Sequence, residues 1–194
     1  MSHPQRGGLA SRRGGALLRM VGGPTPCYAS PMPALILPLA EAAAHLPTRG
    51  ALVGLDLGTK TIGVAASDPD RRLAAAVETI ARKTFSADAA RLIALAAERQ
   101  AVAFVLGLPI NMDGSEGPRA QATRAFARNL ARLTELPIAL WDERLSTAAV
   151  ERELIAANVT RARRARVIDQ HAAAYILQGA LDRLSRGALA PLRH

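Results

Sequence analysis

The sequence is poor in cysteine and in aromatic side chains. Its 194 residues include one cysteine, and 3% of them are aromatic. A single thiol, Cys27, excludes an internal disulfide and a metal site built from several cysteines, which fits a reducing compartment. We therefore expect a cytoplasmic protein. So few aromatic rings also argue against base stacking as the main source of affinity for a nucleic acid.

Long apolar runs are missing as well. Residues 32–46 form the only candidate for a membrane span, and prolines interrupt it before it reaches the roughly 20 apolar residues that a bilayer requires. We expect a soluble protein with no membrane partner.

Lysine and acidic residues are scarce relative to arginine. The chain carries 25 basic and 16 acidic residues, for a net charge of +9, and only Lys60 and Lys83 among the basic residues are lysines. We attribute part of this preference for arginine over lysine to the base composition of the genome. The basic balance still favours an anionic partner such as nucleic acid.

The chain divides into a tail and one domain. Residues 1–50 are basic and rich in proline and glycine, so we expect a largely disordered extension with a short helix over 34–45. Residues 51–186 have the length of one domain, and residues 187–194 form a flexible tail.

Hydrophobic patterning predicts an α/β fold for that domain. Three short apolar runs punctuated by glycine and turn residues predict an antiparallel meander, and two later strands alternate with helices, which predicts parallel crossovers. A helix capped by Ser86 is expected to bury Ala90, Ile93, Ala94 and Ala97 on one face. The predicted strands are 52–57, 61–67, 73–79, 102–107 and 137–141; the predicted helices are 86–100, 118–133, one from 146, and 167–184. The result is a mixed five-stranded sheet flanked by helices.

Three acidic positions stand out against this pattern. Asp56 lies near the end of an apolar strand and before a glycine turn, and burying a lone carboxylate there is costly. A metal ion offsets that cost, whereas the structural alternative is an aspartate that caps its own turn. The pair Asp142-Glu143 follows another strand, where it equally suits the amino terminus of the next helix.

The third position, Asp169, lies on a helix. It shares a face with Ala172, Ala173, Ile176 and Ala180, a stripe that we expect to face the core, so its carboxylate requires a polar or metallic partner. His171 falls off that stripe and is expected at the surface.

Carboxylates from two strand ends and one helix are able to converge on divalent cations. Oxygen ligands favour Mg²⁺ or Mn²⁺ over zinc. Two such ions activate a water and stabilise the departing oxygen of a phosphodiester, which points to a nuclease. The polar loop 108–118 is predicted beside the same strand ends, where it is placed to close over a substrate.

Four motifs in order resemble the YqgF family, also called RuvX. They are Gly54-Leu55-Asp56-Leu57-Gly58-Thr59-Lys60, Gly107-Leu108-Pro109 with Asn111-Met112-Asp113-Gly114-Ser115, Asp142-Glu143-Arg144-Leu145-Ser146-Thr147, and Asp169-Gln170-His171-Ala172-Ala173. The resemblance covers roughly residues 51–184. Thr61 departs from the basic residue that the family often has there, which concerns one phosphate contact.

The resemblance implies a ribonuclease H-like fold with a metal-binding catalytic triad of Asp56, Glu143 and Asp169. It also implies trimming of the 5′ end of precursor 16S rRNA. We expect Mg²⁺ or Mn²⁺ as the cofactor and a monomer or weak homodimer. The expected phosphate contacts are Lys60, Arg144, Arg161, Arg163, Arg164 and Arg166.

Alternative functions stay open at this point. They are a Holliday-junction or other DNA nuclease acting on a structured nucleic acid, and a non-catalytic RNA-binding module of ribosome assembly. The stretch Asp56-Leu57-Gly58-Thr59 also looks like the first phosphate loop of actin-like ATPases. Those enzymes need two duplicated domains, for which the 144 residues after the tail are too few.

Overall fold

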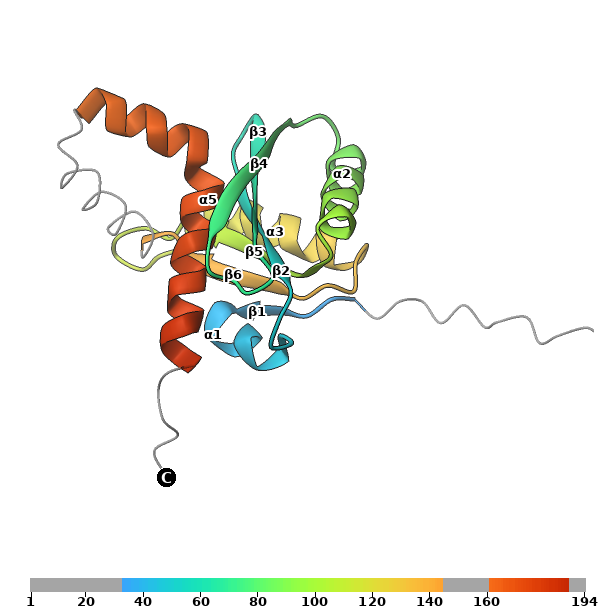
Figure 1. The fold of residues 1–194 in the computed structure, drawn as a ribbon. Coiled ribbons are helices and arrows are strands. Elements are labelled where there is room, and N and C mark those ends of the chain that lie inside the picture. Colours follow the sequence, from blue (N-terminus) through green and yellow to red (C-terminus); the bar gives the residue numbers. More distant parts are fainter. Residues whose placement is uncertain (1–32, 145–160, 189–194) are drawn as a thin grey trace, which may run out of the picture. The chain divides into compact units, whose positions relative to one another are not determined.

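The computed structural model describes residues 33–144 and 161–188, and the side chains of residues 33–144 and 171–186. These residues lie in one compact unit, Pro31–His194. The elements in order are β1 Ile36–Pro38, α1 Leu39–Ala42, the 3-10 turn η1 Ala43–His45, β2 Ala51–Leu57, β3 Thr61–Ser67, β4 Ala74–Ala81, α2 Phe85–Glu98, β5 Ala101–Leu108, α3 Pro118–Ala131, β6 Ile138–Asp142 and α5 Arg161–Ala188 (Figure 1). No helix in these ranges is long and apolar enough to cross a bilayer.

The strands form one mixed sheet in the order β1-β6-β5-β2-β3-β4. Strands β2, β3 and β4 are antiparallel neighbours, whereas β2, β5, β6 and β1 run parallel. The predicted meander and the two predicted parallel strands are therefore confirmed. The predicted count of five strands is wrong, because the sheet has six.

The additional strand, β1, lies within the region where the sequence predicted a helix over 34–45. Its three residues pair with Ile138–Leu140, and the Ile138 N–H donates to the Leu35 carbonyl at 2.8 Å. Pro38 has no N–H to donate, which suits an edge strand, and the short helix α1 begins directly after it. A three-residue strand is too short to show an alternating pattern, so the sequence alone does not reveal it. The predicted helix over 34–45 is therefore too long, because α1 begins at Leu39.

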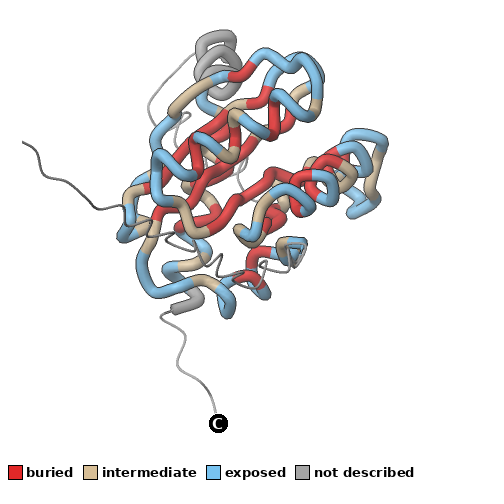
Figure 2. The backbone as a smooth tube through the Cα atoms, turned by 90° about the vertical axis from the view of Figure 1, so that its right-hand side faces the viewer, coloured by how far each residue is buried: buried red, intermediate tan, exposed pale blue. Residues whose placement is uncertain are grey.

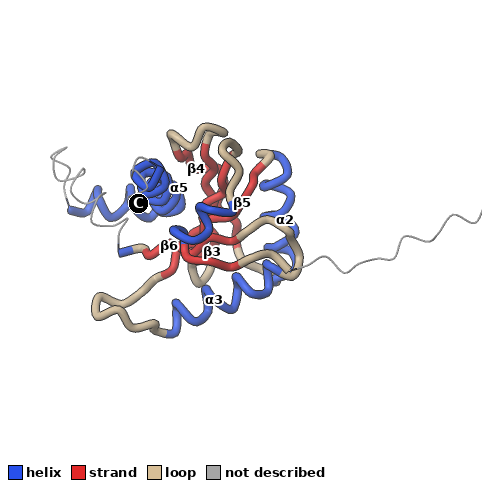
Figure 3. Tube along the Cα trace, turned by 90° about the horizontal axis from the view of Figure 1, so that it is seen from below, coloured by secondary structure: helices blue, strands red, loops and turns tan. Residues whose placement is uncertain are grey.

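Helices cover both faces of the sheet (Figure 3). Helices α2 and α3 pack on one face with Leu55, Ile62 and Phe104 at its centre. Helices α1 and α5 pack on the other face, where Leu52 and Val105 meet α5. Buried backbone accordingly gathers in the central strands and on the inner sides of the helices (Figure 2).

Helix α2 differs from its prediction in cap and in face. Its N-cap is Thr84, whose hydroxyl accepts from the Ala87 N–H at 3.3 Å, in place of Ser86. Of the four residues predicted to be buried, three are exposed and Ile93 is half-buried. The helix instead buries Ala89, Leu92, Leu95 and Ala96. Alanines lie all round this helix, so the apolar periodicity alone did not select the face.

Helix α5 approaches the sheet closely because two strand positions carry no side chain. A Cβ atom on Gly54 would lie 2.7 Å from Leu177 Cβ and 3.2 Å from the Ala173 carbonyl oxygen. A Cβ on Gly63 would lie 3.3 Å from Ala173 Cβ. The helix departs from helical geometry at His171, where φ is −124° and ψ is 15°. The glycines therefore fix the position of α5 just after this kink.

We expect Gly54→Ala to destabilise the protein by about 1–3 kcal/mol, because the added methyl overlaps α5 and the backbone must shift. The comparison variant is Gly63→Ala, whose methyl meets α5 at a longer distance and should cost less. Urea unfolding of both variants measures the difference. Equal stability of Gly54→Ala and wild type would contradict close packing at this position.

Candidate active site

Asp56 lies one residue before the end of β2 and pairs across the sheet with Gly63 of β3. The turn that follows is closed by the Gly58 N–H, which donates to the Thr61 carbonyl at 2.9 Å. A Cβ on Gly63 would lie 3.5 Å from the Asp56 Cβ. The half-buried Asp56 carboxylate therefore lies on the α5 face of the sheet, beside a strand position that has no side chain.

Glu143 follows β6 directly and is held above the end of β5. Its N–H donates to the Leu108 carbonyl at 3.2 Å. A Cβ on Gly107 would lie 2.6 Å from Glu143 Oε1 and 2.7 Å from Ile176 Cδ1. Gly107 thus makes room for the carboxylate. This explains why the first residue of the Gly-Leu-Pro motif is a glycine.

The two carboxylates interact electrostatically. The pKa of Glu143 is raised to about 7, mainly by burial, then by the negative charge of Asp56, with a smaller contribution from Asp142. The positive charge of Arg119, in the first turn of α3, acts in the opposite direction. The structure therefore brings Asp56 and Glu143 of the predicted triad to one charged centre.

Asp142 has a different environment from its neighbour Glu143. The Arg144 guanidinium donates to both of its carboxylate oxygens, with Nη2 to Oδ2 at 2.6 Å, and these hydrogen bonds lower the pKa of Asp142. Arg144 Nη1 also donates to the Asn111 carbonyl at 3.4 Å. Arg144, predicted as a phosphate contact, thus holds Asp142 and the loop after β5.

That loop, the polar loop 108–118, is internally hydrogen-bonded. The Asn111 N–H donates to the Ser115 carbonyl at 3.0 Å, and the Asp113 carboxylate accepts from the Ser115 N–H at 2.9 Å and from its hydroxyl at 2.6 Å. Gly114 at its tip has a φ of 86°, a conformation that favours glycine. The polar residues of the motif build the loop itself.

Five further predicted residues lie on the first part of α5, where side chains are outside the described residues. They are Arg161, Arg163, Arg164, Arg166 and Asp169. Within the described side chains no group of three or more His, Cys, Asp or Glu is close enough to hold a metal ion. The third member of the predicted triad therefore stays a prediction.

The sheet brings two unpredicted basic residues beside Lys60. The Arg82 N–H donates to the Lys60 carbonyl at 2.9 Å, and Arg82 Nη1 donates to the Gly58 carbonyl at 2.9 Å. Lys60, Arg82 and Lys83 are all exposed. Their proximity comes from the pairing of β3 with β4, which joins residues 20 or more positions apart. A local sequence motif does not predict such a contact.

Comparison with known proteins places this geometry in a family. The RuvX family model, described as Holliday junction resolvase, matches residues 50–183. The chain belongs to the RuvX family. A protein of Rhodopseudomonas palustris (strain TIE-1) named "Putative pre-16S rRNA nuclease" is 82% identical over 154 residues, which cover 79% of this chain and 96% of that protein. A relative of the same name from Nitrobacter winogradskyi is 79% identical over 154 residues, covering 79% of this chain and 94% of the relative.

The fold of this RuvX-family chain also occurs in a solved nuclease. The structure titled T. thermophilus RuvC in complex with Holliday junction substrate aligns with a TM-score of 0.50 and 11% identity, covering 73% of this chain and 98% of that one. This likeness concerns the fold alone. It confirms the predicted ribonuclease H-like architecture. The relatives at about 80% identity identify the chain as a nuclease, a hydrolase of ester bonds.

We expect the stability of the metal-free protein to fall as the pH rises from 5 to 8. The folded protein keeps the Glu143 proton up to about pH 7, whereas the unfolded chain releases it near the ordinary value of 4.5. Glu143 therefore costs stability above pH 7, by at most about 3 kcal/mol. Glu143→Gln stays neutral and should be more stable than wild type at pH 8 but not at pH 4.

Chemical denaturation of both proteins across that range, with divalent cations chelated, measures the effect. An identical pH dependence in the two proteins would show that Glu143 keeps an ordinary pKa.

Proposed function

We propose that this protein hydrolyses phosphodiester bonds of RNA and trims the 5′ end of precursor 16S rRNA in the bacterial cytoplasm. The relatives at about 80% identity, which align over nearly their whole length, carry this name. The observation that supports the chemistry is the electrostatic interaction of two carboxylates at the carboxyl ends of parallel strands, Asp56 near the end of β2 and Glu143 directly after β6.

The donor set fits a divalent cation. Two carboxylates that repel one another and are partly buried are stabilised when a cation neutralises them. All their ligand atoms are oxygens, which favours Mg²⁺ or Mn²⁺ over softer metals. We assign Asp56 and Glu143 to this cation, with Asp169 as the third ligand. A bound divalent cation supplies activation of a water molecule and stabilisation of the departing oxygen.

The remaining charged residues have separate tasks in this proposal. Asp142, already bound by Arg144, does not compete for the cation. Arg119 lies close enough to lower the pKa of Glu143, and its exposed guanidinium is placed to bind a phosphate oxygen near the cation. Lys60, Arg82 and Lys83 extend the positive surface from the β2–β3 turn to the end of β4. The RNA strand in this proposal therefore runs along the carboxyl ends of these β-strands.

We expect Asp56→Asn to abolish metal-dependent cleavage while leaving the fold intact, because it removes a negative ligand and keeps the side-chain shape. Cleavage of a 5′-extended 16S rRNA precursor and of a four-way DNA junction, with Mg²⁺ or Mn²⁺, measures the effect. Glu98→Gln is the matched control, since it makes the same change at an exposed carboxylate on α2.

The outcomes separate the candidate functions. Precursor trimming that is lost only in Asp56→Asn supports the proposal. Cleavage of the junction alone keeps the site and changes the substrate to DNA, as the description of the family model suggests. Folded wild-type protein that cleaves neither substrate would instead support a binding module of ribosome assembly.

We expect the double change Arg82→Gln and Lys83→Gln to weaken RNA binding and to reduce the slope of log affinity against log salt by about 1 to 2, because each lost phosphate contact removes about 0.7 for a single strand. The control pair is Arg99→Gln with Arg132→Gln. These exposed residues precede β5 and β6 and so lie at the opposite edge of the parallel strands. Equal slopes in the two double variants would exclude the β4 end from the RNA path.

A further inference from the structure

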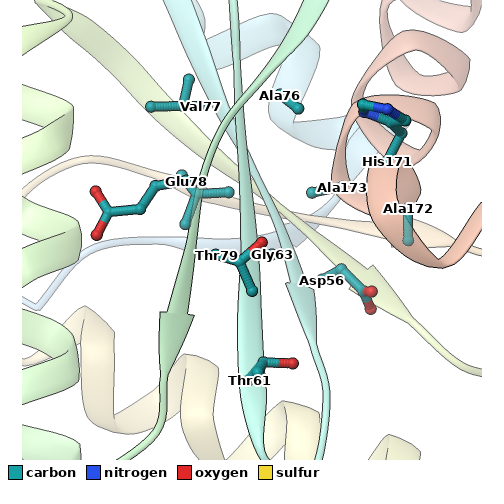
Figure 4. A pocket seen from close by; sticks show the side chains of 11 residues that line it. Asp56, Thr61, Gly63, Ala76, Val77, Glu78, Thr79, His171, Ala172 and Ala173 are labelled. Carbon is teal, nitrogen blue, oxygen red and sulfur yellow. The ribbon is translucent and has the colours of Figure 1, made fainter.

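A cavity of about 300 Å³ adjoins Asp56 on the α5 face of the sheet. Strands β3 and β4 form its floor, and α5 forms one wall (Figure 4). Asp56 and Thr61 lie at one end of the cavity and His171 and Ala76 at the other (Figure 4). The cavity thus leads from a proposed metal ligand to the outer part of the sheet, and the chemistry described so far does not use it.

The kink of α5 and a series of small residues create this space. Ala173 is buried against the sheet, Ala172 is half-buried and His171 is exposed, so the helix leaves the sheet at the kink. Below it the strands carry Gly63 and Ala76, which fill little volume. The room is therefore built into the backbone and does not depend on the rotamer of a long side chain.

The lining suits a neutral group with hydrogen-bonding edges. Hydroxyl groups come from Thr61 and Thr79, and an imidazole ring comes from His171. None of the eleven described residues around the cavity is Lys or Arg, so the described lining away from Asp56 offers hydroxyl and imidazole groups to a ligand. Glu78 belongs to the lining by its backbone position, but its carboxylate points away toward α2 and pairs with Arg91 at 2.7 Å (Figure 4).

The dimensions restrict the ligand further. A volume of about 300 Å³ lies at the lower end of the range for small-molecule sites and admits one nucleoside, whereas a base-paired duplex is far larger. Single-stranded RNA is recognised through unstacked bases that lie on flat rings, histidine included, and through the ribose 2′-hydroxyl. The cavity offers a ring at one end and a hydroxyl next to the proposed cleavage centre at the other.

We propose that this cavity binds one unstacked nucleoside of the RNA, the one adjacent to the phosphodiester that is cleaved. The ribose lies at the end with Asp56 and Thr61, and the base lies between Thr79 and His171. This inference rests on the proposed function, because it places the cleaved bond at Asp56. It adds that the enzyme recognises a single-stranded nucleotide at that bond by shape and stacking, and not by charge.

The test uses a set of precursor RNAs that carry a single abasic ribose at each of the positions flanking the cleavage site. We expect one position, next to the cleaved bond, at which loss of the base weakens binding to wild-type protein by about 5-fold to 150-fold, the range that base stacking supplies. Fluorescence anisotropy in Ca²⁺ measures binding without relying on cleavage, and cleavage rates in Mg²⁺ are measured on the same RNAs.

Two variants of the full chain localise the base to the cavity. Ala76→Leu fills the cavity, and His171→Ala removes the ring from its wall. Both should bind the unmodified RNA about as weakly as wild type binds the abasic RNA, and neither should lose further affinity when the base is removed. Ala75→Leu is the matched control, because it adds the same side chain one position earlier on β4, an exposed position outside the cavity lining.

The outcomes are distinct for this inference and for the function on which it rests. A base effect that persists in Ala76→Leu and His171→Ala as in wild type, or no position with a base effect, would overturn the cavity assignment even if cleavage is normal. A base effect that disappears in both variants supports binding of an unstacked nucleoside in the cavity even if no RNA is cleaved, a result that would refute the nuclease function and the position of that nucleoside next to a cleaved bond. A changed Mg²⁺ requirement in Ala76→Leu, without a changed base effect, would show that the cavity belongs to the metal site.

Discussion

The contact between α5 and the two glycines of β2 and β3, Gly54 and Gly63, determines how α5 lies relative to the Asp56 carboxylate. Leu177 and Ala173 rest on the backbone at Gly54 and Gly63, so the helix axis comes closer to the sheet than any larger residue permits. The same contact ends at His171, where the helix departs from regular geometry. The end of this contact opens the cavity beside Asp56 and sets the direction in which the first part of α5 runs.

Sheet topology explains why residues 87 positions apart meet. Asp56 lies near the end of β2 and Glu143 directly after β6, and these parallel strands flank β5, so their carboxyl ends lie at the same end of the sheet. The glycine at position 107 then allows the Glu143 side chain to cross β5 toward Asp56. Burial, and after it repulsion from Asp56, raises the pKa of Glu143, and the proposed cation would relieve that repulsion.

The sequence was informative where residues are chemically unusual and uninformative where they are interchangeable. Carboxylates at the ends of apolar strands, glycine turns and strand lengths predicted the meander, the crossovers and the position of Asp56. Strand β1 escaped detection because three residues carry no periodicity, and the face of α2 was mistaken because alanine occurs on every side of it. Lys83 and Arg82 join Lys60 only through strand pairing, which local patterns do not encode.

Charge is distributed unevenly between the edge that carries the carboxylates and the cavity behind it. At the edge, Lys60, Arg82, Lys83 and Arg119 are exposed, and Arg144 is committed to Asp142. Away from Asp56, the described residues that line the cavity contribute hydroxyls and an imidazole. A polyanion whose phosphates follow the cations must therefore turn an uncharged part of one nucleotide toward the cavity. Backbone attraction sets affinity in such an arrangement, and the cavity selects strands with a free base at the reacting position.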